Sequence, residues 1–180
     1  MARFIAGQAM GRAFADPVKV RGTAKLNNEG TDDWAAAILT FENGIVAQVS
    51  CAVMANLDNV LRIHGSEGRI EVPDFWFANG NRDQGLGRID IIRQGKTETV
   101  SVNETRHVYS FEADAAAEAI FAARQELAAP GMSWADSLGN ARVLDAWRSR
   151  MPDRFYIECQ RLGLPGEAEY LERAVELAAR

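Results

Sequence analysis

Two histidines and two cysteines are the residues of this 180-residue chain whose types most readily carry chemistry. His64 lies on the more polar side of an expected strand, and His107 lies where a strand gives way to a helix. A histidine can act as a general base or bind a metal, but neither one has a clustered carboxylate or thiol to support that role. We therefore interpret His64 as a solvated or partner-facing residue and His107 as a loop residue.

The cysteines and the acidic pairs also give no indication of a metal or catalytic site. Cys51 and Cys159 are too few for a disulfide framework or a zinc cage. Cys51 belongs to an apolar strand face, so we interpret it as a small buried hydrophobic residue. Two carboxylates could share acid/base work at Asp32–Asp33, which is typical of a turn, or at Glu112 and Asp114, which are typical of a helix start. No partner residue supports either pair.

A phosphate-binding loop is suggested by Gly80, Gly85 and Gly87. Their spacing does not match Gly-x-Gly-x-x-Gly, and a strand follows them where such a site needs a helix N-terminus. We interpret them as a hairpin loop. The chain also has no Walker loop and no nucleophile elbow, so these residue types by themselves indicate no active site.

Composition defines the class of protein. Lys+Arg 20 against Asp+Glu 25 gives 20 − 25 = −5, and hydrophobic residues make up 47% of the chain. These values exclude a disordered chain, and a pI near 5.1 excludes a protein that tracks a nucleic-acid backbone. No segment approaches the roughly 20 consecutive apolar residues of a membrane span. The sequence predicts a soluble, acidic, cytoplasmic globular protein that binds neither nucleic acid nor a membrane.

The chain opens on a helical pattern over residues 1–10, in which Phe4, Ile5 and Ala9 share one face. No Ser, Thr, Asp or Asn precedes it as a cap, so we expect the chain to begin inside a helix whose first turns lie upstream. An alternative is an Arg-containing targeting peptide, although the small-residue cleavage pattern is unconvincing. Asp16-Pro17 ends the helical pattern.

Strand patterns dominate the middle of the chain. Asn43-Gly44 predicts a tight hairpin, and the segment before it has two apolar faces, with Ile38 on one and Leu39 on the other. Short turns imply antiparallel neighbours. We predict an α+β fold with one open, mostly antiparallel sheet of about six or seven strands and helices packed on one face. The expected strands cover 18–26, 32–41, 45–55, 61–64, 69–72, 88–92 and 97–102.

Helical patterns return after residue 107. One covers about 108–128, and Ser133 caps the next, with Asp136 in a box-like position. The second helix has an apolar stripe that we assign to the core: Trp134, Leu138, Ala141, Leu144 and Trp147. Two shorter patterns, 153–162 and 167–180, form a C-terminal extension at 151–180 without an assigned role. Residues 1–150 are predicted to form the main domain.

Four segments together resemble the C-terminal domain of the Gfo/Idh/MocA oxidoreductases, the family of glucose-fructose oxidoreductase, inositol dehydrogenase and dihydrodiol dehydrogenase. Any one of them is degenerate, but their order and spacing over residues 1–150 make the combination specific. The segments are TDDWAAAILTFENG (31–44), RIHGSEGRIEV (62–72), YSFEAD (109–114) and MSWADSLGNARVLD (132–145).

The resemblance implies an N-terminal Rossmann domain that binds NAD or NADP, and acid/base residues early in a helix that enters the second domain. Residues 1–7 look like the latter part of that helix. No residue of this chain matches the family's glycine loop, catalytic lysine or acid/base residue, so we assign it no catalytic, cofactor-binding or metal-binding residue. Asn56, Asp58 and Asn59 lie where family members often contact substrate, although a plain polar turn explains them about as well.

Two functions follow as hypotheses. The first is the substrate-binding and oligomerisation domain of a truncated NAD(P)-dependent oxidoreductase that acts on sugars, polyols or diols, is not catalytic alone and forms a homo-oligomer through its sheet face. The second is a free-standing, non-enzymatic binding or assembly module that uses the same open sheet. The DNA upstream separates them, since an in-frame Rossmann pattern supports the first and a stop codon with a promoter supports the second.

Overall fold

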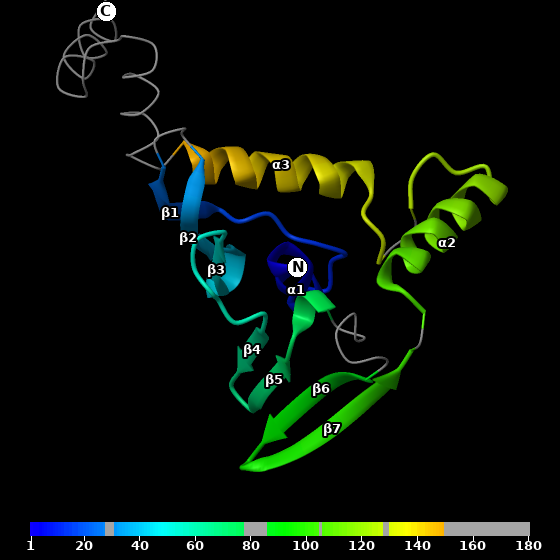
Figure 1. Ribbon diagram of the computed structural model, residues 1–180, viewed down its shortest axis with the longest axis horizontal. Coiled ribbons are helices and arrows are strands. Elements are labelled where there is room, and N and C mark those ends of the chain that lie inside the picture. The colour runs from blue at the N-terminus through cyan, green and yellow to red at the C-terminus, as the bar shows by residue number, and fades with distance from the viewer. Residues whose placement is uncertain (28–30, 78–85, 105, 128–129, 150–180) are drawn as a thin grey trace, which may run out of the picture. The chain divides into compact units, whose positions relative to one another are not determined.

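Seven strands and three α-helices make up the part of the chain described by the structure, a computed structural model (Figure 1). The strands form two antiparallel sheets, so the predicted α+β class is confirmed. The chain divides into two compact units, of which the first holds residues 1–56 and 132–149 and the second begins at Leu57 and ends at Gly131. The structure describes residues 1–27, 31–77, 86–104, 106–127 and 130–149.

The first unit contains a three-stranded sheet in the order β1 (Lys19–Leu26), β2 (Asp32–Thr40) and β3 (Val46–Ala52). The turn between β2 and β3 is the predicted Asn-Gly hairpin. The loop is Glu42–Gly44, in which Asn43 has φ 61° and Gly44 has φ 83°, both in the left-handed region that asparagine and glycine adopt most readily. The amide of Phe41 donates a 2.8 Å hydrogen bond to the carbonyl oxygen of Ile45, which closes the turn.

One face of this sheet is buried and the other is open. On β2, Leu39 is 4% exposed and Ala37 is 3% exposed, whereas Ile38 is 50% exposed. The two apolar faces predicted for this strand are therefore unequal, because α1 (Ala2–Ala9) and α3 (Trp134–Arg148) supply residues that pack against the Leu39 side. The core cluster consists of Ala6, Ala15, Val20, Ala37, Leu39 and Phe41.

Helix α3 packs on the core through a face that shares only Trp147 with its predicted stripe. The Ser133 hydroxyl accepts a 3.1 Å hydrogen bond from the amide of Asp136, which confirms the predicted cap. The face toward the core carries Val143, Ala146 and Trp147, and Gly22 on β1 leaves the space that Trp147 occupies. The predicted core stripe is thus wrong for Trp134, Leu138, Ala141 and Leu144, which are exposed.

The second unit contains a four-stranded sheet in the order β4 (Leu61–Gly65), β5 (Gly68–Val72), β6 (Leu86–Arg93) and β7 (Lys96–Asn103). Helix α2 (Val108–Phe121) follows it and ends earlier than the pattern to residue 128 predicts. His107 lies at the predicted junction, where its Nδ1 accepts a 3.4 Å hydrogen bond from the amide of Tyr109 and so caps α2.

The single sheet expected from the sequence is wrong, although all seven predicted strands are present. β3 and β4 are separated by residues 53–60, and β5 and β6 by residues 73–85, so the length of a connection does not by itself decide which strands pair. The amides of Val53 and Met54 both donate to the carbonyl oxygen of Asp33, at 3.0 and 3.1 Å. This convergence on one acceptor ends the regular β2–β3 ladder at Ala52, and β4 pairs only with β5 in the described residues.

Several predictions fall outside the described residues and stay predictions. They concern the C-terminal extension at 151–180, the domain boundary at residue 150, Cys159, and the glycines Gly80 and Gly85. Among the described helices, none is both long enough and apolar enough to cross a membrane.

Candidate functional site

The most buried charged side chain of the first unit is Arg3 on α1, which is 6% exposed. Its Nε donates a 2.7 Å hydrogen bond to Oδ1 of Asp16, and its Nη1 donates to both the carbonyl oxygen and Oδ1 of Asp136. The guanidinium carbon also lies 4.7 Å from the centre of the Phe14 ring. Arg3 therefore joins the first helix, the loop that follows it and the first turn of α3.

Two glycines make this cluster possible. A Cβ at Gly139 would overlap with the Arg3 guanidinium, and a Cβ at Gly7 would overlap with the backbone of Phe14. Because an arginine side chain only donates hydrogen bonds and does not lose its proton in proteins, the cluster positions elements rather than moving protons. Our sequence analysis missed Arg3, although its spacing from Ala6 and Gly7 places all three on one helix face.

The predicted substrate residues lie in the segment between β3 and β4. Asn56 is exposed and ends the first unit, while Asp58 and Asn59 open the second unit. Asp58 is exposed, and Asn59 is half-buried with its carbonyl oxygen accepting from the amide of Phe75. Their role in binding a substrate stays a prediction.

Cys51 is exposed, so its interpretation as a buried residue is wrong. It occupies β3, an edge strand of the first sheet, where α1 and α3 provide less cover than they do over β2. Partial burial raises the pKa of the Cys51 thiol, and the nearby Asp32 carboxylate raises this pKa further, while a hydrogen bond with the backbone of Ala35 lowers it. A raised pKa disfavours the thiolate, which is the reactive form.

The remaining candidates serve structure. His64 is exposed on β4, in line with its interpretation as a solvated residue. Asp33 belongs to β2 rather than to a turn and pairs with Lys25 at 3.2 Å. The prediction that Glu112 and Asp114 mark a helix start is wrong, because α2 begins at Val108 and both lie within it; Asp114 pairs at 3.0 Å with Arg106, which precedes the helix. Within the described residues, no group of three or more His, Cys, Asp or Glu side chains could hold a metal ion.

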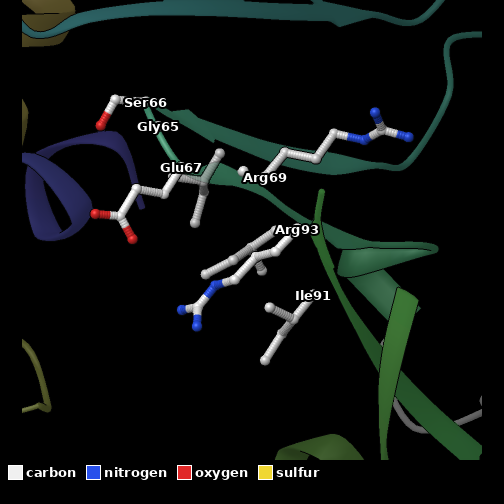
Figure 2. A pocket seen from close by; sticks show the side chains of 9 residues that line it. Gly65, Ser66, Glu67, Arg69, Ile91 and Arg93 are labelled. Atoms are coloured by element: carbon white, nitrogen blue, oxygen red, sulfur yellow. The ribbon is translucent and has the colours of Figure 1, made fainter. Parts of the chain in front are cut away.

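A hollow of about 270 Å³ lies in the second unit, where the β4–β5 turn meets the end of β6 (Figure 2). Ile63, Ile70 and Ile91 line it, and they are successive partners across β4, β5 and β6. Glu67 and Arg93 lie at its rim, and their head groups extend to the same side in Figure 2. The sequence gives no sign of this hollow, because it depends on the pairing of β5 with β6 across residues 73–85.

Residues 1–71 match the family model of the GFO/IDH/MocA C-terminal domain. The resemblance to this family is confirmed. A relative, trans-1,2-dihydrobenzene-1,2-diol dehydrogenase of Mus musculus, is 23% identical over 73 residues, which cover 38% of this chain and 22% of that protein.

Solved structures with a similar fold are also oxidoreductases. The 3-ketoreductase KijD10 of Actinomadura kijaniata, in complex with NADP and TDP-benzene, has a TM-score of 0.64 and 20% identity, over 84% of this chain and 44% of that one. The UDP-N-acetylglucosamine 3-dehydrogenase of Acidithiobacillus ferrooxidans has a TM-score of 0.56 and 22% identity, over 76% of this chain and 41% of that one. The chain spans less than half the length of each of these proteins.

Proposed function

We propose that the chain is the substrate-binding and oligomerisation domain of a cytoplasmic NAD(P)-dependent oxidoreductase that acts on sugars, polyols or diols. The observation that carries this proposal is the family match over residues 1–71. The likeness in fold to a ketoreductase in complex with NADP and to a sugar-nucleotide dehydrogenase supports it. In this proposal a separate dinucleotide-binding domain performs the hydride transfer.

The proposal that a separate domain binds the dinucleotide can be tested directly. Dinucleotide binding needs backbone donors at a strand–turn–helix phosphate site, and we assign that site to the separate domain. We therefore expect the isolated 180-residue chain to give no saturable change in NADH fluorescence at micromolar concentrations. Saturable micromolar binding would contradict this part of the proposal.

Asn56, Asp58 and Asn59 are the residues proposed to hold the substrate. Amide and carboxylate groups suit a polyhydroxylated ligand, because they accept and donate hydrogen bonds to neighbouring hydroxyls. In an NMR titration with a sugar or diol, we expect amide shifts to concentrate in residues 56–59, and Asp58→Ala to reduce them. Ser101→Ala, at an exposed polar position on β7, is the control that should change nothing.

The oligomer in this proposal forms through the open face of the first sheet. Trp34 is 39% exposed, Ile38 50% and Val46 62%, and these residues follow one another on the same side of β2 and β3. Arg21 and Lys25 on β1 border them and provide a polar rim. An apolar centre with a polar rim is the usual anatomy of a protein interface, and the proposed occupant is a second copy of the chain.

Two neighbouring substitutions separate folding from association. Leu39→Lys places a charge in the core and should cost about 3 kcal/mol or more of unfolding free energy, enough to unfold the domain. Ile38→Lys places the same charge on the open face, so it should leave the circular-dichroism melt intact and weaken the association seen by sedimentation at least tenfold. Two folded and fully associated variants would exclude an oligomer through this face.

A further inference from the structure

We propose that the turn end of the second sheet binds a small amphipathic anion, with its phosphate or carboxylate head at Arg93 and Lys96 and its apolar body on the three isoleucines. The proposal rests first on a difference in ion pairing between the interior of this sheet and its turn end.

In the interior of the sheet, Arg62 pairs with Glu71 at 3.3 Å and Arg88 pairs with Asp90 at 3.0 Å.

The turn end of the same sheet carries cations without such partners. Arg69, Arg93 and Lys96 make no ion pair with any residue that the structure describes. All three side chains are exposed, and they gather at one end of a chain whose net charge is −5. A local excess of positive charge in an acidic protein attracts anions.

Strand register places two of these cations side by side. Arg93 on β6 is the direct partner of Lys96 on β7. Gln94 with φ 50° and Gly95 with φ 74° form the turn between them, and this geometry holds the pair in register. Like charges directly opposite each other on antiparallel strands are destabilising, and an anion bound between them would remove that cost.

Two glycines open the surface beside Arg93. Gly65 is the partner of Gly68, and a Cβ at Gly68 would overlap with the carbonyl oxygen of Ile92. The position of that absent Cβ lies 2.9 Å from Cγ of Arg93, so the arginine stem crosses over Gly68. A Cβ at Gly65 would meet only one atom, the carbonyl oxygen of Gly68 at 3.7 Å, so the surface at Gly65 is open.

The floor of the hollow limits the size of the ligand. Ile63, Ile70 and Ile91 are half-buried and lie on one face of three neighbouring strands. The volume of about 270 Å³ is near the lower end of small-molecule sites, so it suits a single ring or a short chain. Glu67 at the rim disfavours a second anionic group, which selects a ligand with one charged head.

Arg69 provides a built-in control. It has the same charge and lies at the same end of the sheet, but Figure 2 shows its side chain leaving the hollow in the direction opposite to that of Arg93. Arg69 also lines the hollow, but its head group points away from it, so replacing Arg69 removes one positive charge from the region and leaves the Arg93 guanidinium in place. The two arginines therefore separate a specific contact from a general electrostatic field.

The test is an NMR titration of the full 180-residue chain at low ionic strength. Phenyl phosphate and phenylacetate are the amphipathic probes, with inorganic phosphate and phenol supplying the head and the ring alone. We expect at least one amphipathic probe to shift the amides of Gly65, Gly68 and Arg93, and to bind at least fivefold more tightly than either part. If neither does, or if the head alone binds as tightly, the proposal is wrong.

Substitutions then identify the contact. Arg93→Gln should weaken the better probe about tenfold, the value of one charge-assisted hydrogen bond, and Arg69→Gln should weaken it less than twofold. Equal losses in the two variants would reduce the effect to a general field and overturn the site. If Arg93→Gln proves unstable by circular dichroism, Arg93→Lys replaces it, because lysine keeps the charge and removes the planar guanidinium fork. Lys96→Gln is measured as a separate variant. If neither Arg93→Lys nor Lys96→Gln changes the affinity for the probe, the proposed site is wrong.

Discussion

Leu39 and Phe41 in the first unit are 4% and 2% exposed, whereas Ile63, Ile70 and Ile91 in the second unit are only half-buried. Leu39 and Phe41 lie on and directly after β2, and the three isoleucines lie on β4, β5 and β6, all of them antiparallel strands. The difference is cover, because α1 and α3 place residues on one face of the first sheet, and the core cluster found in the described residues draws on the first unit alone. A sheet can thus be fully paired and still lack a core.

This difference shows which interactions are local and which are distant. Hairpins form between neighbouring segments, but the cover of the first sheet joins α1 to α3 from opposite ends of the described chain. Arg3 provides the polar link between these two helices through Asp136. We expect the stability of the first unit to depend on this cover, and the stability of the second to depend more on its strand pairing.

The largest expected effect compares the two sheets directly. Leu39→Ala should cost about 2–5 kcal/mol of unfolding free energy, because it empties a buried site in the core cluster. Ile70→Ala, the matched change on the half-buried sheet, should cost about 1 kcal/mol from the apolar area that is lost. Amide hydrogen exchange measured on β2 and β5 reports the two units separately. Similar losses in both would contradict the difference in cover.

A smaller effect concerns the link between the helices. Arg3→Ala should cost about 3 kcal/mol, since it leaves Asp136 without its buried partner, and Arg3→Met should cost less because it removes the charge but keeps apolar volume. Arg12→Ala is the control: Arg12 pairs with Glu42 at 3.1 Å with both side chains largely exposed, and such a pair contributes about 0–1 kcal/mol. If Arg3→Ala and Arg12→Ala lower the melting temperature equally, Arg3 does not have the structural role assigned to it.

The smallest effect tests where the cover of the first sheet ends. In a Cys159→Ser background, alkylation of Cys51 should reach half its maximal rate at a higher pH than it does for an ordinary thiol, because partial burial and Asp32 both raise the Cys51 pKa. Asp32→Asn should move this midpoint to lower pH, since it removes a repulsive charge from the thiolate. Asp33→Asn, next to it in the chain and paired with Lys25, should leave the midpoint unchanged. A midpoint insensitive to Asp32 would refute this electrostatic cause.

Local signals predicted the elements well. Asn43-Gly44 indicated a hairpin and Ser133 indicated a helix start, and both are present because each depends on the conformation and hydrogen bonds of a few adjacent residues. The predictions for Cys51 and for the α3 stripe were wrong, because apolar character alone does not say which face of an element another element will cover. The spacing of Arg3 from Ala6 and Gly7 was a local signal of its burial, but its partners Asp16 and Asp136 come together only in the folded chain.

The sequence by itself determined seven strands, their antiparallel neighbours, the helix starts at Val108 and Trp134, and the resemblance to the GFO/IDH/MocA C-terminal domain. These features follow from backbone preferences and from turns that act over a few residues. Only the tertiary structure decided that the strands divide into two sheets, that Leu39 rather than Ile38 faces the core, and that α3 packs through Val143, Ala146 and Trp147. Those outcomes depend on which distant segments exclude water from a given surface, and periodicity along one segment carries no information about its distant partner.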